Sequence, residues 1–135
     1  MGTSGRTMGI SPVDYAYKRT GAKNFPETVK AVEQAVGAHG FDVHACYDIS
    51  GAVVAKGFEI RPLVILEVGP AGDEVDLPLS LVLPCRINIY EEDGDVVVAA
   101  LRPTVFTAVF PEHDLEDIAR EVEVTIIGIV DSAVE

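Results

Sequence analysis

The chain has 135 residues, of which 48% are hydrophobic and 24% are charged, and this size favours one globular domain. Ten Lys and Arg residues against 22 Asp and Glu residues give a formal net charge of -12, which repels nucleic acid and anionic membranes. The sequence shows neither an apolar run that could span a bilayer nor the pattern of a secretory signal, and two cysteines are too few for a disulfide scaffold. We therefore expect a cytoplasmic protein with reduced thiols and without nucleic-acid or membrane partners.

The N-terminal part combines a tail with the clearest helix signal of the sequence. Residues 1–12 are rich in Gly, Ser and Thr, which predicts a flexible tail, and a first strand is expected over 13–20. Asn24 can cap the next element, and Glu27 three positions on completes a capping box. Residues at helical spacing follow before Gly40, a natural stop: Phe25, Val29, Val32, Val36 and His39.

Two further strands are predicted in the middle of the chain. Residues 41–50 alternate strictly, which indicates a half-buried strand. Its two faces are Phe41, Val43, Ala45, Tyr47 and Ile49 on one side, and Asp42, His44, Cys46 and Asp48 on the other. A short irregular or helical insert over 51–57 separates it from an apolar strand over 63–68, and residues 69–78 are expected to form a loop.

A hairpin is predicted around the dipeptide Asp93–Gly94, which is typical of a two-residue turn. Centring the turn there pairs Glu92 with Asp95, and further pairs follow: Ile89 with Val98, and Ile87 with Ala100. One hairpin face is small or apolar: Cys85, Ile87, Ile89, Val98 and Ala100. The other is also too apolar for a fully solvated surface, which indicates cover by another element or by a second subunit: Arg86, Asn88, Tyr90, Val97, Ala99 and Leu101.

The C-terminal part is predicted to be helical. A short helix is expected after Pro103, and a longer one opens at Asp114 with acids in its first turn, where the helix dipole favours negative charge. Its apolar residues keep helical spacing, although many are β-branched: Leu115, Ile118, Val122, Ile126, Ile129 and Val130. The order strand, helix, two strands, hairpin and helix predicts a single α+β domain over 13–135, with an antiparallel sheet of about five strands flanked by helices.

Several spaced motifs then carry a resemblance that spans about residues 15–130: "ETVKAVEQAVGAHGFDV", "DISGAV", "RPLVILEVGP", "LVLPCRINIYEEDGDV" and "ALRP". In these motifs and their order the chain resembles the family called domain of unknown function 302. The resemblance implies an α+β domain of small cytoplasmic proteins that form dimers and have no established biochemical role. Two departures stand out: the segment after Gly69 and Pro70 is short and acidic where the family has an amphipathic helix, and Arg102 stands where the family has an acid.

Cys85 is the first candidate site residue, because a positive neighbour such as Arg86 or Arg102 would lower the pKa of its thiol. The hairpin register places Cys85 opposite Arg102 but on the apolar face, so a packed, inert thiol is the favoured interpretation. Arg61, ahead of an apolar strand, is the basic residue best placed for anion contact, although a surface salt bridge explains it as well. Cys85, Arg61 and Arg102 are therefore the candidate ligand-binding residues.

Other clusters give weaker signals. His44 and Cys46 share a predicted strand face with Asp48, but zinc needs about four ligands and no second pair is visible, so no metal site is predicted. The Glu, His and Asp residues over 111–117 could serve general acid–base chemistry, but helix capping and the helix dipole explain the acids. No phosphate loop or nucleophile elbow is present, and no cofactor and no catalytic residue are predicted.

The sequence therefore favours a dimeric, non-enzymatic module that binds a small apolar or amphipathic ligand, or a protein partner, over the less polar hairpin face. The alternative is a thiol-dependent enzyme or redox sensor that uses Cys85, and a third, weaker hypothesis is metal binding through His44 and Cys46.

Overall fold

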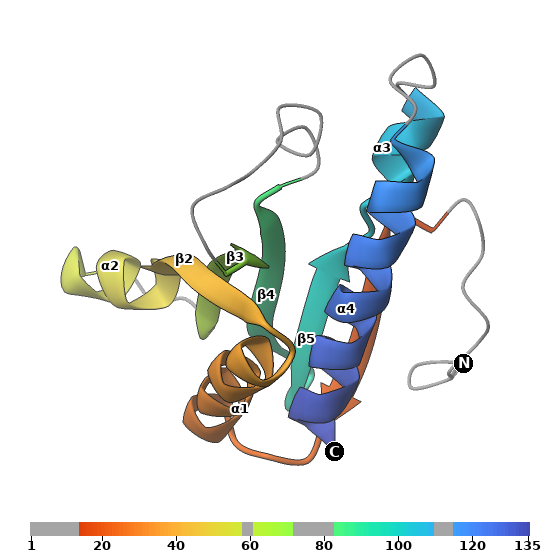
Figure 1. The fold of residues 1–135 in the computed structure, drawn as a ribbon. Coiled ribbons are helices and arrows are strands. Elements are labelled where there is room, and N and C mark those ends of the chain that lie inside the picture. Colours follow the sequence, from red (N-terminus) through yellow and green to blue (C-terminus); the bar gives the residue numbers. More distant parts are fainter. Residues whose placement is uncertain (1–13, 58–60, 72–82, 110–114) are drawn as a thin grey trace.

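The computed structural model describes residues 14–57, 61–71, 83–109 and 115–135, so the tail predicted over 1–12 lies outside the described residues. The elements follow the predicted order (Figure 1): β1 (Ala16–Gly21), α1 (Phe25–Ala38), β2 (Phe41–Asp48), α2 (Ile49–Ala55), β3 (Leu63–Pro70), β4 (Cys85–Glu92), β5 (Asp95–Leu101), α3 (Thr104–Val109) and α4 (Glu116–Val134). They confirm the predicted α+β class. The strand β3 includes Gly69 and Pro70, which the sequence assigned to a loop.

The five strands form one antiparallel sheet in the order β1-β5-β4-β3-β2. The predicted hairpin register is confirmed, with Ile87 opposite Ala100, Ile89 opposite Val98 and Glu92 opposite Asp95. The turn residues Asp93 and Gly94 have φ values of 53° and 86°. Positive φ at both central positions is what a two-residue turn needs to match the twist of its strands.

The two long helices, α1 and α4, pack against each other and against the same face of the sheet (Figure 1). We call this the covered face. Its alternate strand residues are buried with the apolar stripes of both helices: Val64, Leu66, Val68, Cys85, Ile87, Ile89, Val96, Val98 and Ala100. Helix α4 forms although many of its residues are β-branched. Burying its apolar stripe stabilises the helix by more than the low helix propensity of these residues costs.

Helix α1 begins as predicted, with the Asn24 side chain accepting a hydrogen bond from the Glu27 backbone N–H at 2.9 Å. Its predicted last stripe residue, His39, is exposed and is the C-cap rather than a core residue. The imidazole Nε2 is 3.2 Å from the Ser132 hydroxyl, so it contacts α4 at the surface. Helix α4 begins two residues after the predicted start, and Asp114 itself lies outside the described residues.

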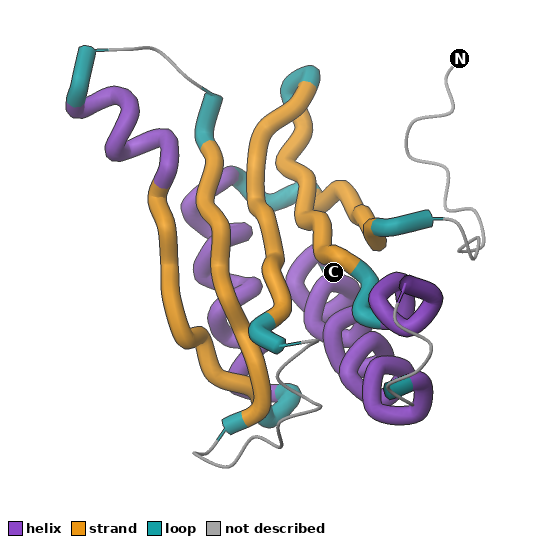
Figure 2. The backbone as a smooth tube through the Cα atoms, turned by 90° about the horizontal axis from the view of Figure 1, so that it is seen from above, coloured by secondary structure: helices purple, strands orange, loops and turns teal. Residues whose placement is uncertain are grey.

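Polar contacts fix β1 and α3 to α4. The Tyr17 hydroxyl donates to Asp131 Oδ1 at 2.6 Å, and Arg19 Nη1 donates to the same oxygen at 2.7 Å. At the other end of α4, α3 lies beside its first turns (Figure 2). The last helix therefore contacts both the edge strand and the short helix that follows β5.

The predicted strict alternation of β2 is wrong after Val43, because the strand contains a β-bulge between Val43 and Ala45. Val43 pairs with Val68 and Cys46 with Leu66, so both lie on the covered face, whereas Ala45 pairs with Glu67 on the opposite face. One extra residue reverses the side-chain alternation that follows it. A bulge has no apolar signature in the sequence, so the pattern alone could not show it.

Candidate functional site

The opposite side of the sheet, which we call the open face, forms three rows of side chains across the strands. The register places Ala16 next to Leu101, and Arg86 next to Glu67 and then Ala45. The second row is Lys18, Ala99, Asn88, Ile65 and Tyr47, and the third is Thr20, Val97, Tyr90 and Leu63. The open face is therefore mainly apolar but carries charged groups in two of its rows, Arg86 and Glu67 in the first and Lys18 in the second.

A groove of about 260 Å³ crosses the open face over β1, β5 and β4. Its lining residues are Tyr15, Ala16, Arg86, Asn88, Tyr90, Ala99, Ala100 and Leu101. The hollow forms where Ala16 and Ala99 carry short side chains between longer ones. Tyr15 is 63% exposed and Leu101 is 37% exposed, so apolar surface at this site is accessible to solvent.

Arg86 is the charged residue of the groove lining, and its side chain is 64% exposed. Its Nε lies 3.6 Å from Glu67 Oε2 on the neighbouring strand. The Tyr47 hydroxyl donates to the other carboxylate oxygen of Glu67 at 3.1 Å, and this hydrogen bond raises the pKa of Tyr47. Because Glu67 is shared with Tyr47 and Arg86 is largely in solvent, the ion pair leaves the guanidinium accessible.

Cys85, the sequence candidate for thiol chemistry, lies at the start of β4 on the covered face and is 5% exposed. Burial raises the pKa of its thiol to about 12. Only the thiolate is a nucleophile, so a neutral, buried thiol is poorly suited to covalent or redox chemistry. The prediction that this cysteine points into the core is confirmed.

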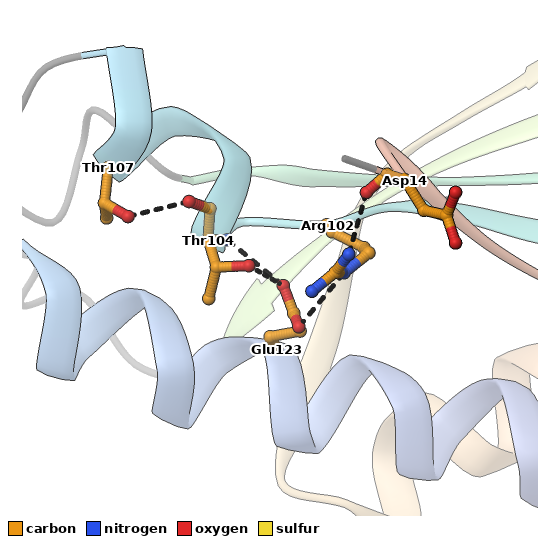
Figure 3. Close-up of polar contacts among 5 residues, drawn as sticks. All are labelled: Asp14, Arg102, Thr104, Thr107 and Glu123. Carbon is orange, nitrogen blue, oxygen red and sulfur yellow. Dashed lines mark hydrogen bonds and ion pairs between the residues drawn. The ribbon is translucent and has the colours of Figure 1, made fainter. Parts of the chain in front are cut away.

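Arg102, the second candidate, belongs to a buried ion pair rather than to an open site (Figure 3). Its Nε lies 3.2 Å from Glu123 Oε2, each side chain is 11% exposed, and its Nη1 donates to the Asp14 carbonyl at 2.8 Å. The other Glu123 oxygen accepts from the Thr104 backbone N–H at 3.1 Å and from its hydroxyl at 2.6 Å. This network joins the β1 entry, the start of α3 and α4, which is a structural role.

Arg61, the third candidate, is exposed just before β3. Since Leu63 pairs with Tyr90 and Val68 with Cys85, Arg61 lies at the opposite end of the sheet from Cys85 and Arg102. The structure therefore does not bring the three candidates together.

The shared strand face predicted for His44 and Cys46 is wrong because of the bulge. Cys46 lies on the covered side but is exposed to solvent, and partial desolvation together with the negative charges of Glu33 and Asp48 raises the pKa of its thiol. A Cβ added to Gly69 would lie 3.1 Å from His44 Nε2, which places the imidazole over β3 on the open side. Within residues 14–57, 61–71, 83–109 and 115–135, no group of three metal-ligating side chains is present.

The family assignment follows from comparison with known proteins. The family model "Domain of unknown function DUF302" matches residues 17–133. The chain belongs to the DUF302 family. The crystal structure of an uncharacterized conserved DUF302 protein from Bacillus stearothermophilus superposes with a TM-score of 0.78 and 23% sequence identity, covering 88% of this chain and 98% of that chain. At this identity the likeness shows the fold alone, and no curated protein matches the chain.

The sequence identified five of the eight residues that line the groove in this DUF302 chain. The hairpin register identified Arg86, Asn88, Tyr90, Ala99 and Leu101 as one surface that was too apolar for full solvation. Tyr15 and Ala16 were missed, because the pairing of β1 with β5 joins segments about 80 residues apart and leaves no local signal. No helix in the described part of the DUF302 chain meets both the length and the apolarity that a membrane crossing needs.

Glu123 was also missed as the partner of Arg102. It occupies the buried stripe of α4 together with Ala119, Val122 and Ile126. A carboxylate on an otherwise apolar stripe indicates a buried ion pair, because burying a charge alone is costly. That signal was available in the sequence of α4, but the identity of the partner was not.

Proposed function

We propose that this DUF302 chain is a binding module that takes up a small amphipathic molecule in the groove on its open face. The observation that carries the proposal is the lining of the groove. Apolar surface from Tyr15, Ala99 and Leu101 lies beside hydrogen-bonding groups of Arg86 and Asn88. Small-molecule sites typically combine apolar walls with a few polar groups that fix orientation.

The size of the groove limits the ligand. A volume of about 260 Å³ is just below the usual range of about 300–1,000 Å³ for ligand sites, so it suits a short chain or a single ring rather than a nucleotide or a large cofactor. The groove lies on paired strands, with β5 hydrogen-bonded to both β1 and β4. We therefore expect binding without rearrangement of the sheet.

Amide chemical shifts during titration with octan-1-ol test this proposal. We expect shifts centred on the groove strands, and an Ala99→Leu substitution that fills the hollow is expected to weaken binding by about tenfold. Ala45→Leu is the matched control, because Ala45 lies on the same face with β4 and β3 between it and β5. Shifts outside the groove, or equal binding by the Ala99→Leu variant, contradict the proposal.

A second candidate is self-association of two copies through the open face. It is favoured by large exposed hydrophobic side chains on or beside both edge strands, Tyr15 at 63% and Tyr47 at 45% exposure. Exposed apolar patches on a small domain often mark an interface. Light scattering on the purified chain at micromolar concentration is expected to give twice the mass of 14.4 kDa, and Tyr47→Glu to restore the monomer. A monomer at that concentration contradicts self-association.

The structure gives no comparable support for a thiol enzyme. The Cys85 thiol is buried on the covered face with a raised pKa, whereas the groove lies on the opposite face. A ligand in the groove would therefore be separated from the sulfur by the sheet itself.

A further inference from the structure

We infer that the molecule bound in the groove carries an anionic group, which Arg86 holds. This inference rests on the proposed function and adds the chemical class of the ligand. It starts from charge, because Arg86 is the one charged side chain among the described residues that line the groove. A ligand with a carboxylate or a similar head group would complement it, and guanidinium and carboxylate match in geometry.

The rows of the open face show where the two ends of such a ligand would lie. Arg86 lies in the row of Ala16 and Leu101, at one side of the groove. Ala99 and Tyr90 belong to the next two rows and extend an apolar path away from the guanidinium. A head group at Arg86 therefore directs an apolar tail over Ala99 toward the Tyr90 ring.

A second cation lies beside the same path. Lys18 of β1 is paired with Ala99 and is exposed on the open face. Two acids are also close: Glu67 lies on the far side of Arg86, and the exposed Asp14 directly precedes the groove residue Tyr15. The charged side chain in the described lining of the groove, Arg86, is positive, in contrast to the formal net charge of -12 for the whole chain. Charges beyond about 8 Å are largely screened at physiological ionic strength, so the local groups decide the sign of the ligand.

Glu67 makes the inference testable in both directions. Its carboxylate lies 3.6 Å from the Arg86 guanidinium and therefore competes with an incoming anion. Removing the Glu67 charge should strengthen the binding of an anionic ligand, and removing the Arg86 charge should weaken it. A neutral ligand of the same length should respond to neither change.

The experiment compares octanoate, octan-1-ol and octylamine by amide chemical-shift titration of the full chain and of three variants. We expect octanoate to bind about three- to tenfold more tightly than octan-1-ol, as for a partly exposed charged hydrogen bond. Arg86→Gln should remove this difference and leave octan-1-ol unchanged, and Glu67→Gln should strengthen octanoate binding. Arg120→Gln is the matched control, because Arg120 is 59% exposed and forms its ion pairs within α4.

The outcomes separate the inference from the function on which it rests. If octan-1-ol binds as tightly as octanoate, or octylamine binds most tightly, the anionic assignment is wrong while the groove remains a binding site. If octanoate and octan-1-ol both leave the groove amides unshifted, the proposed function fails as well. Thermal unfolding of each variant establishes that the fold is retained, and equal loss of octanoate binding in Arg86→Gln and Arg120→Gln also overturns the inference.

Discussion

Side chains alternate between the two faces of the sheet, but the long helices cover only one of these faces. On the covered face, Ile87 and Ile89 are fully buried beneath the helices, whereas on the open face Ile65 is half-buried and Leu101 is 37% exposed. Both faces of the hairpin are apolar enough to form a core. Strand composition therefore makes a face suitable for burial, while the position of α1 and α4 decides which face the helices cover.

The same contrast holds for two Arg–Glu pairs. Arg102 and Glu123 are each 11% exposed, and their atoms approach to 3.2 Å. Arg86 and Glu67 on the open face are 64% and 20% exposed and lie 3.6 Å apart. Identical residue types therefore hold the structure together in one place and leave a guanidinium accessible to a ligand in the other.

The largest expected effect comes from breaking the buried ion pair. Glu123→Ala should lower the free energy of unfolding by about 3 kcal/mol, because it removes the Glu123 carboxylate from the buried Arg102 guanidinium and the acceptor for Thr104. Glu67→Ala on the open face should cost less than about 1 kcal/mol. Urea unfolding of both variants measures the difference, and equal losses would show that the two pairs are equivalent.

A matched pair of isoleucines on neighbouring strands tests the two faces directly. Ile87→Ala on β4 should destabilise the fold by about 3 kcal/mol, because Ile87 is fully buried and its truncation opens a cavity in the core. Ile65→Ala on β3, on the open face, should cost about 1 kcal/mol or less. A similar loss for Ile65→Ala, measured by the same unfolding assay, would indicate that the open face is buried in solution, as in a dimer.

A smaller effect is expected from the buried thiol at alkaline pH. The pKa of Cys85 is raised from 9.0 to about 12 in the folded chain, so the stability that this thiol contributes is fully present below pH 9 and is lost as pH rises toward 12. The slope approaches about 1.4 kcal/mol per pH unit. Between pH 9 and pH 10, wild type should therefore lose about 1 kcal/mol more than Cys85→Val. Identical pH profiles for the two proteins would mean that the thiol ionises while folded.

Residues close together in sequence were predicted well. Asn24 and Glu27 gave the start of α1, and Asp93–Gly94 gave the hairpin register from which both hairpin faces followed. His44 and Cys46 were separated by a bulge, which depends on the pairing with β3 rather than on the residues themselves. Local rules therefore worked until a distant partner changed the geometry.

Distant contacts explain why the candidate site was only partly predicted. Arg102 was singled out, but its partner Glu123 is on α4, and that contact turned a candidate binding residue into a structural one. Arg86 was placed on the hairpin face too apolar for full solvation and noted as a possible neighbour of Cys85, but only the pairing of β1 with β5 placed it at a groove. The sequence showed the chemistry of each side chain but not whether that side chain is exposed to solvent.

By itself, the amino-acid sequence determined the elements, the hairpin register and the inward position of the Cys85 sulfur, because capping, turn geometry and side-chain periodicity act over a few neighbouring residues. Only the tertiary structure decided that β1 joins β5, that α1 and α4 cover one face, and that Arg86 rather than Arg102 is accessible. These outcomes depend on which elements pack against each other. The free energy gained when two distant elements bury apolar surface depends on both of them, so neither segment of sequence shows it alone.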